Sequence, residues 1–164
     1  MTPRTRVAIG SLALSAAGFV GIVLQEGYSD NAIIPTKGDV PTVGFGSTTG
    51  VKMGDTITPP RAVARAASEL DTVYEAAVKR CVKAPLHQAE YDVYVDMTYN
   101  IGTAAFCQSS MVVRLNSGDY AGACNAILLW NKVGAQRCDA PGNRVCAGLW
   151  KRRLASNAKC MAAQ

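Results

Sequence analysis

The pattern of apolar and polar positions divides the chain into an apolar leader, a glycine-rich stretch and a series of helices. An uncharged stretch runs from Val7 to Leu24. At helical rise, its length covers most of the hydrocarbon core of a bilayer. Between Gly27 and Gly50, short apolar runs alternate with glycine and proline, which predicts a small β-hairpin region with irregular turns.

The remainder of the chain has helical periodicity. Thr58 followed by Pro59 is typical of an N-cap with proline at the first helical position, and this helix is predicted to run to about Arg80. Further helical patterns cover residues 87–100, 111–115, 120–131 and 146–162. The sequence therefore predicts an α+β fold in which a small β lobe is inserted near the start of a mainly helical domain, with a cleft between the lobes.

The apolar leader is predicted to be a membrane-targeting element. Arg4 and Arg6 precede it, and this positive flank places the N-terminus in the cytoplasm and the chain after Gln25 outside it. Gly, Ala and Ser make up half of the leader, so it is expected to be only marginally stable in lipid. Three interpretations remain: a permanent anchor, a signal anchor that later releases, and a signal peptide cleaved near the small residues 15–17.

Net charge and residue composition indicate which kinds of partner and cofactor the chain can bind. The formal net charge of +5 favours an anionic partner such as cell-wall polymer or lipid headgroups. No basic run with interleaved aromatic residues supports nucleic-acid binding. His87 is the single histidine, and no cysteine stands at metal-finger spacing from it, so neither a metal nor another cofactor is expected.

Six cysteines, all after residue 80, predict disulfides formed in an oxidising compartment. The alternative is that they are small buried apolar residues of a reduced protein. Six cysteines allow about fifteen pairings, and spacing alone does not settle which is used. The short separation around the Pro141-Gly142 turn favours one pair, a tie between two late helices favours a second, and the third is the pair that remains. The expected pairs are Cys138 with Cys146, Cys124 with Cys160, and Cys81 with Cys107.

Several ordered motifs follow the leader. Glu26-Gly27 ends the apolar stretch, and Pro41-Thr42-Val43-Gly44-Phe45-Gly46 follows. Later pieces are Tyr99-Asn100-Ile101-Gly102, Ala105-Phe106, Leu115-Asn116-Ser117-Gly118-Asp119-Tyr120, Trp130, Gly148-Leu149 and Arg152-Arg153. In their order and spacing these motifs resemble the phage-lysozyme family, glycoside hydrolase family 24, from residue 26 to the C-terminus.

The resemblance implies a lysozyme-like fold and a glycosidase mechanism. Cleavage of a glycoside needs a protonated carboxyl group to donate to the leaving oxygen, and the resemblance assigns this role to Glu26. A second group must orient water or stabilise the oxocarbenium-like transition state. In the family an aspartate and a threonine do this, and the threonine here is Thr42.

The aspartate is where the sequence departs from the family pattern. The family's usual acid falls near Pro35 or Thr36, and neither side chain can serve. Asp39, three residues before Thr42, is the favoured candidate, although Gly38-Asp39 is also good turn chemistry. Asp30 is the other candidate, and more often such a residue is a solvated turn acid.

Three further residues match positions that line the family's substrate groove: Tyr99, Asn100 and Ser109. Without the resemblance, the first two would be interpreted as a helix end followed by a capping glycine. A second departure from the pattern is Ser47, where many relatives carry a histidine of structural role.

Together with the apolar leader, the motifs resemble phage lysozymes of the signal-anchor-release (SAR) endolysin type. The resemblance therefore predicts an N-terminal signal-anchor-release helix at 1–25 and a phage-lysozyme catalytic domain at 26–164. The expected function is that of a monomeric phage endolysin that hydrolyses, with inversion, the β-1,4 bond between N-acetylmuramic acid and N-acetylglucosamine. Its partners would be the glycan strands and, through residues 7–24, the host inner membrane before release into the periplasm. Because no cysteine precedes Cys81, release is expected to be purely topological. The alternatives are a lytic transglycosylase on the same fold and a non-catalytic membrane-tethered wall-binding module.

Overall fold

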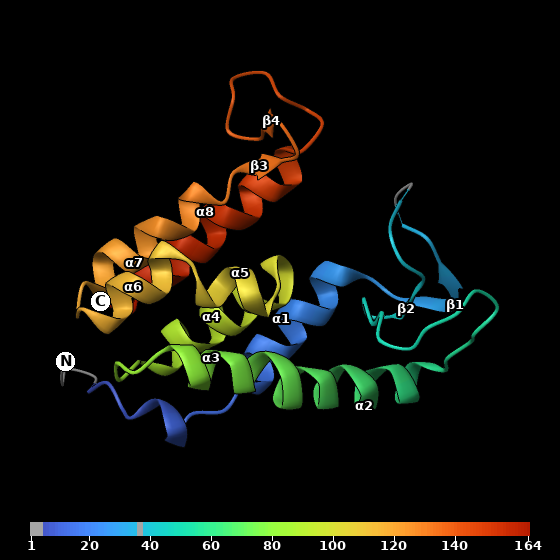
Figure 1. The fold of residues 1–164 in the computed structure, drawn as a ribbon, viewed down its shortest axis with the longest axis horizontal. Coiled ribbons are helices and arrows are strands. Elements are labelled where there is room, and N and C mark those ends of the chain that lie inside the picture. Colours follow the sequence, from blue (N-terminus) through green and yellow to red (C-terminus); the bar gives the residue numbers. More distant parts are fainter. Residues whose placement is uncertain (1–4, 36–37) are drawn as a thin grey trace. The chain divides into compact units, whose positions relative to one another are not determined.

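The computed structural model describes residues 5–35 and 38–164, which form two compact units (Figure 1). The hairpin unit comprises Ala13–Ala76. The helical unit comprises the chain up to Leu12 together with Ala77–Gln164.

The first helix of the hairpin unit, α1, spans Ala16–Glu26. It begins there because the Ser15 hydroxyl oxygen accepts a hydrogen bond from the Gly18 amide at 3.0 Å, which satisfies an otherwise unpaired N–H of the first turn. It ends at Glu26, as expected, because Gly27 has a φ of 72° that takes the chain out of the helix.

The apolar stretch 7–24 is thus not one helix in this structure. Residues 12–15 lie outside any helix, and serine at position 15 acts as a cap rather than as a helix interior. Among the helices of 5–35 and 38–164, none has both the length and the apolar character needed to cross a membrane.

The predicted hairpin is present. β1 (Ser29–Ile33) and β2 (Thr42–Gly44) pair antiparallel, with Ser29 opposite Gly44 and Ile33 opposite Thr42, and the register between these pairs is irregular (Figure 1). The hairpin buries Ala32 and Val43 against Val51, with Ile57 packed on this small cluster.

Helix formation after Thr58 also follows the prediction. α2 (Pro59–Glu69) continues without a break into a π-helical segment, η2 (Leu70–Glu75), and then into α3 (Ala76–Cys81). The Thr58 backbone is extended as an N-cap should be, but its side chain makes no capping hydrogen bond. The sequence did not predict the π-helical segment.

The helical unit contains the remaining elements. They are η1 (Ile9–Ser11), α4 (Gln88–Ile101), α5 (Thr103–Cys107), α6 (Ser110–Asn116), α7 (Tyr120–Ala126), η3 (Ile127–Leu129), β3 (Lys132–Val133), β4 (Gln136–Arg137) and α8 (Ala147–Met161). Four of these match the predicted helices, although the helix expected to reach residue 131 ends at 126 and continues only as one 3₁₀ turn. α5 and the short β3–β4 hairpin were not predicted.

The core of the helical unit is centred on α4, which contacts α5 and α8. Tyr91, Tyr94 and Met97 of α4 are fully buried, and α6 and α7 pack on each other beside it. α4 begins at a capping box in which the Glu90 carboxylate accepts a hydrogen bond from the His87 amide.

Three disulfides cross-link the helical unit, and they are the pairs expected from the sequence. The Cα–Cα separations are 5.4 Å for Cys81–Cys107, 5.5 Å for Cys124–Cys160 and 5.0 Å for Cys138–Cys146. The first ties α3 to α5, the second ties α7 to α8, and the third closes the loop between β4 and α8. Each separation lies in the range that disulfides require.

Candidate active site

Glu26 is the last residue of α1 and its side chain is half-buried. Directly after it, Gly27 turns the backbone with φ 72° and ψ 178°. Tyr28 then stabilises the start of the hairpin by two contacts. Its ring centroid lies 5.4 Å from that of Phe45, and its hydroxyl donates to the Ile57 carbonyl oxygen at 2.7 Å. The carboxyl group is therefore held at a defined helix end rather than in a loose loop.

Tyr74, on the π-helical segment η2, lies within electrostatic reach of Glu26. Burial raises the pKa of the Tyr74 phenol, and the negative charges of Glu69 and Glu26 raise it further. π-Helical turns often occur at functional sites. Sequence analysis did not identify this residue, because a tyrosine at that position fits an ordinary amphipathic helix.

Thr42 begins β2 and is half-buried. Its hydroxyl donates to the Val40 carbonyl oxygen at 3.1 Å. Since Gly44 pairs with Ser29, three residues after Glu26, the hairpin returns β2 alongside the segment that leaves α1.

The two candidate aspartates occupy different positions on the hairpin. Asp39 is exposed and lies in the connection between β1 and β2, outside either strand. Asp30 is an exposed residue of β1, and its Oδ1 accepts a hydrogen bond from Asn31 Nδ2 at 2.7 Å. Pro35 is exposed at the end of the described stretch, and Thr36 lies outside the described residues.

Ser47 joins the hairpin to α2. It is buried, and its hydroxyl donates to Glu69 Oε2 at 2.7 Å. Arg65 donates to the other oxygen of Glu69 at 2.9 Å and to the Thr49 carbonyl oxygen at 2.6 Å. Serine at this position thus takes part in a hydrogen-bonded structural contact.

Tyr99 and Asn100 lie in the last turn of α4, which ends at Ile101 before Gly102, as expected for a helix end with a glycine after it. Tyr99 is half-buried and Asn100 is exposed. Asn100 Oδ1 accepts a hydrogen bond from Arg153 Nη2. Burial, together with the neighbouring charge of Arg152, lowers the pKa of Arg153 to about 10, against the opposing effect of Asp96.

Ser109 is a helix cap. It is buried, and its hydroxyl oxygen accepts a hydrogen bond from the Val112 amide at 3.4 Å at the start of α6. A structural role therefore accounts for this serine, and its predicted contact with substrate stays a prediction.

The hairpin unit carries the candidate acid and its candidate partners, Glu26, Asp30, Asp39 and Thr42. The helical unit carries Tyr99, Asn100 and Ser109.

A surface depression in the helical unit is lined by residues 136–137 and 140–145, and none of the candidate residues lines it. A carboxyl group at a helix end can donate a proton, and a hydroxyl on the second strand of the hairpin that follows can orient water.

Comparison with known proteins finds relatives of this chain in one family. The family model described as phage lysozyme matches residues 24–156, a range that includes every candidate catalytic and substrate-binding residue. The chain is 33% identical over 128 residues to the endolysin of Salmonella phage P22, which covers 75% of this chain and 86% of that protein.

Two further similarities extend over nearly the whole chain. The SAR-endolysin of Pseudomonas phage phiKMV is 33% identical over 150 residues, covering 91% of this chain and 89% of that protein. The structure of the endolysin from Escherichia coli O157:H7 phage FAHEc1 superimposes with a TM-score of 0.77 at 29% identity, covering 94% of this chain and 97% of that one.

Proposed function

We propose that Glu26 is the general acid of this chain, which belongs to the phage lysozyme family. The chain is an endolysin, a glycoside hydrolase that degrades peptidoglycan. The bond cleaved is the β-1,4 linkage between N-acetylmuramic acid and N-acetylglucosamine. The observation that carries the proposal is the place of Glu26, which ends α1 immediately before the hairpin that bears Thr42.

Glu26 donates its proton to the leaving glycosidic oxygen in this mechanism. A carboxyl group at the end of a regular helix is a better-defined donor than one in a loop, and proton donation of this kind contributes about 10²–10⁴-fold to rate. The phenol of Tyr74 lies within electrostatic reach of this carboxyl group, and Gly27 turns the chain directly after it.

Asp39 and Thr42 act on the water that attacks the anomeric carbon. In an inverting glycosidase the two carboxyl groups leave room for a water molecule on the opposite face of the sugar. The connection between β1 and β2 carries Asp39, and the Thr42 hydroxyl can exchange its contact with Val40 for one with that water. Tyr99, Asn100 and Ser109 contact the glycan strand.

Digestion of purified peptidoglycan tests the acid. Glu26→Gln is expected to lower turnover by about 10²-fold or more, because the amide cannot donate an acidic proton, while the melting temperature measured by circular dichroism changes little. Mass spectrometry of wild-type products is expected to find reducing ends. Anhydro-muramic ends would instead indicate a lytic transglycosylase, and full activity of Glu26→Gln would overturn the assignment of the acid.

The N-terminal segment, residues 1–25, acts as a signal anchor that holds the endolysin in the host inner membrane before release into the periplasm. Support comes from the uncharged stretch 7–24 behind Arg4 and Arg6, and from the phiKMV relative, which is itself a SAR-endolysin. While this stretch spans the bilayer, Ala16–Glu26 cannot form α1 within the hairpin unit. The inserted enzyme is therefore inactive.

Strengthening the anchor tests release. Leucine at positions 10, 11, 18 and 21 replaces three glycines and a serine, and each substitution favours the bilayer by several tenths of a kcal/mol or more. After depolarisation, wild type is expected at full length in the soluble periplasmic fraction, whereas the leucine variant stays in the membrane and lysis is delayed. Unchanged lysis timing would defeat the release mechanism, and a shortened wild-type chain would establish cleavage.

A further inference from the structure

The beginning of the chain is built into the helical unit. Val7 and Leu86 form an antiparallel bridge in which each amide donates to the other's carbonyl oxygen at 2.9 Å. Leu86 is fully buried and Leu12 is 6% exposed. The described residues up to Leu12 thus contribute to the fold of the helical unit.

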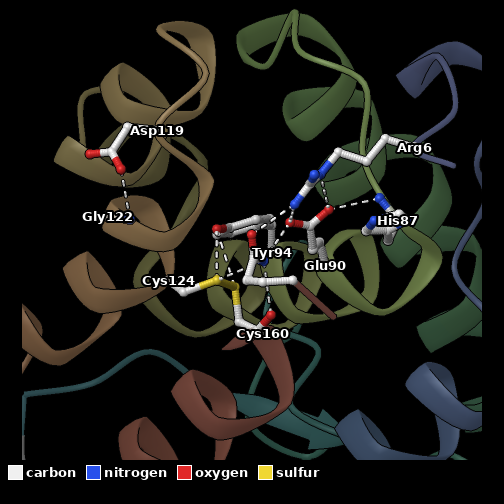
Figure 2. A network of polar contacts seen from close by, with 9 residues as sticks. Arg6, His87, Glu90, Tyr94, Asp119, Gly122, Cys124 and Cys160 are labelled. Atoms are coloured by element: carbon white, nitrogen blue, oxygen red, sulfur yellow. Dashed lines mark hydrogen bonds and ion pairs between the residues drawn. A yellow bond between two sulfur atoms is a disulfide. The ribbon is translucent and has the colours of Figure 1, made fainter. Parts of the chain in front are cut away.

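Arg6 makes the strongest of these contacts. Its Nε and Nη2 donate to the two carboxylate oxygens of Glu90, each at 3.0 Å, in the paired geometry that favours arginine over lysine (Figure 2). The Glu90 side chain is 0% exposed and the Arg6 side chain is 23% exposed. The guanidinium group also lies 3.6 Å from the centroid of the Tyr120 ring, and Nη2 donates to Gln164 Oε1 at 2.7 Å.

The Glu90 carboxylate depends on this arginine for its charge balance. Burial alone would raise its pKa, yet the pKa lies below its ordinary value because of the hydrogen bonds from Arg6, the His87 amide and Gln164 and the charge of Arg6. Beyond Glu90, toward the core, lie the Tyr94 phenol and the Cys124–Cys160 disulfide (Figure 2). Removing Arg6 would leave an uncompensated charge in the core of the helical unit.

Arg6 and Glu90 lie on opposite sides of the uncharged stretch 7–24. If that stretch spans a membrane, Arg6 remains on the cytoplasmic side while Glu90 is outside. Their hydrogen bonds at 3.0 Å then cannot form. They form only when the whole segment, including its positive end, has crossed.

We propose that Arg6, Glu90, Tyr120 and Gln164 form an amino-terminal latch that closes only after the anchor has left the bilayer intact, and that holds the released enzyme in its folded state. The latch rests on the proposed signal anchor. In the latch, Arg6, which orients the anchor in the membrane before release, becomes the counter-ion of the buried Glu90 carboxylate. Cleavage near residues 15–17 would remove Arg6 and with it the latch.

Thermal unfolding of the purified full-length protein tests the pair itself. Arg6→Gln is expected to lower the melting temperature by about 8 °C, because it leaves Glu90 buried without its cation. In a Glu90→Gln background the same change is expected to cost less than about 2 °C. Arg6→Lys, which keeps the charge but loses the paired geometry, is expected to fall between wild type and Arg6→Gln.

Arg114→Gln is the matched control, because Arg114 pairs with Asp119 on the surface of the same unit, with the two side chains 50% and 44% exposed. It is expected to change the melting temperature by less than about 2 °C. Equal losses from Arg6→Gln in the wild-type and Glu90→Gln backgrounds, or no loss in either, would overturn the latch.

Fractionation of cells tests the topological part, with Glu26→Gln in every chain so that lysis does not intervene. Arg6→Lys keeps the positive flank, so membrane insertion is expected to equal that of the parent chain. After depolarisation, the yield of full-length soluble chain is expected to fall at least about twofold, because the released state is less stable. Equal yields would overturn the latch alone, whereas a parent chain never found in the membrane would overturn the signal anchor as well.

Discussion

At the scale of single residues, the hairpin unit shows two kinds of polar side chain. Ser47 and Glu69 are joined by a 2.7 Å hydrogen bond and serve the packing of the loop on α2. Asp39 is exposed in the connection between the strands, where a carboxylate adds nothing to a core. Catalytic residues lie disproportionately on loops that a rigid scaffold positions, which agrees with the role proposed for Asp39.

Substituting each of the two aspartates in turn tests which of them is the second catalytic acid. Asp39→Asn is expected to lower kcat/KM on peptidoglycan by about 100-fold, against less than about threefold for Asp30→Asn, because only the former removes the proposed base. Asp30→Asn serves as the matched control, since both residues are exposed on the same hairpin. The reverse order of effects would mean that Asp30 is the second catalytic acid.

At the scale of elements, the hairpin is held by a few specific contacts rather than by a large core. Gly44 has a φ of 65°, and a Cβ there would lie 3.1 Å from the Cβ of Ala62 on α2. β2 can therefore approach α2 this closely only with glycine at that position. The Ser47 hydroxyl then ties the following loop to the same helix.

Removing that hydroxyl tests how far the loop depends on it. Ser47→Ala leaves Glu69 Oε2 without this donor, and the free energy of unfolding is expected to fall by about 1–2 kcal/mol in urea titrations. Thr48→Ala, a neighbouring exposed position, is expected to stay within about 0.5 kcal/mol of wild type. Equal stabilities of the two variants would show that the contact is not needed.

At the scale of the whole molecule, the cross-links lie entirely in the helical unit. The sequence separation is 36 residues for Cys124–Cys160 and 8 for Cys138–Cys146. A longer closed loop restricts the unfolded chain more, so the first is expected to stabilise the fold more than the second. This arrangement suits a protein that completes its folding in an oxidising compartment.

Replacing both cysteines of each disulfide by alanine tests which disulfide stabilises the fold more. Replacing Cys124 and Cys160 is expected to cost about 4 kcal/mol of unfolding free energy, and replacing Cys138 and Cys146 about 2.5 kcal/mol, in chemical denaturation of the oxidised proteins. An inverted order would indicate that local packing around the buried sulfur atoms, rather than loop length, sets their contribution.

The sequence by itself determined the features that depend on local chemistry. Proline after Thr58 starts a helix, glycine after Glu26 ends one, and the order of the hairpin and helix motifs identifies the family. The Cys138–Cys146 pair also followed from spacing, because a short chain around a turn brings its two ends together. These signals are carried by residues close together in the chain.

Only the tertiary structure decided features that join distant residues. The Arg6–Glu90 pair spans 84 positions, and nothing in a leader arginine indicates that it neutralises a buried carboxylate. The π-helical segment that carries Tyr74 and the break of the leader at Ser15 likewise depend on packing and competing hydrogen bonds. Local sequence sets the preference of each segment, but the contacts that select among nearly equal backbone conformations come from elsewhere in the fold.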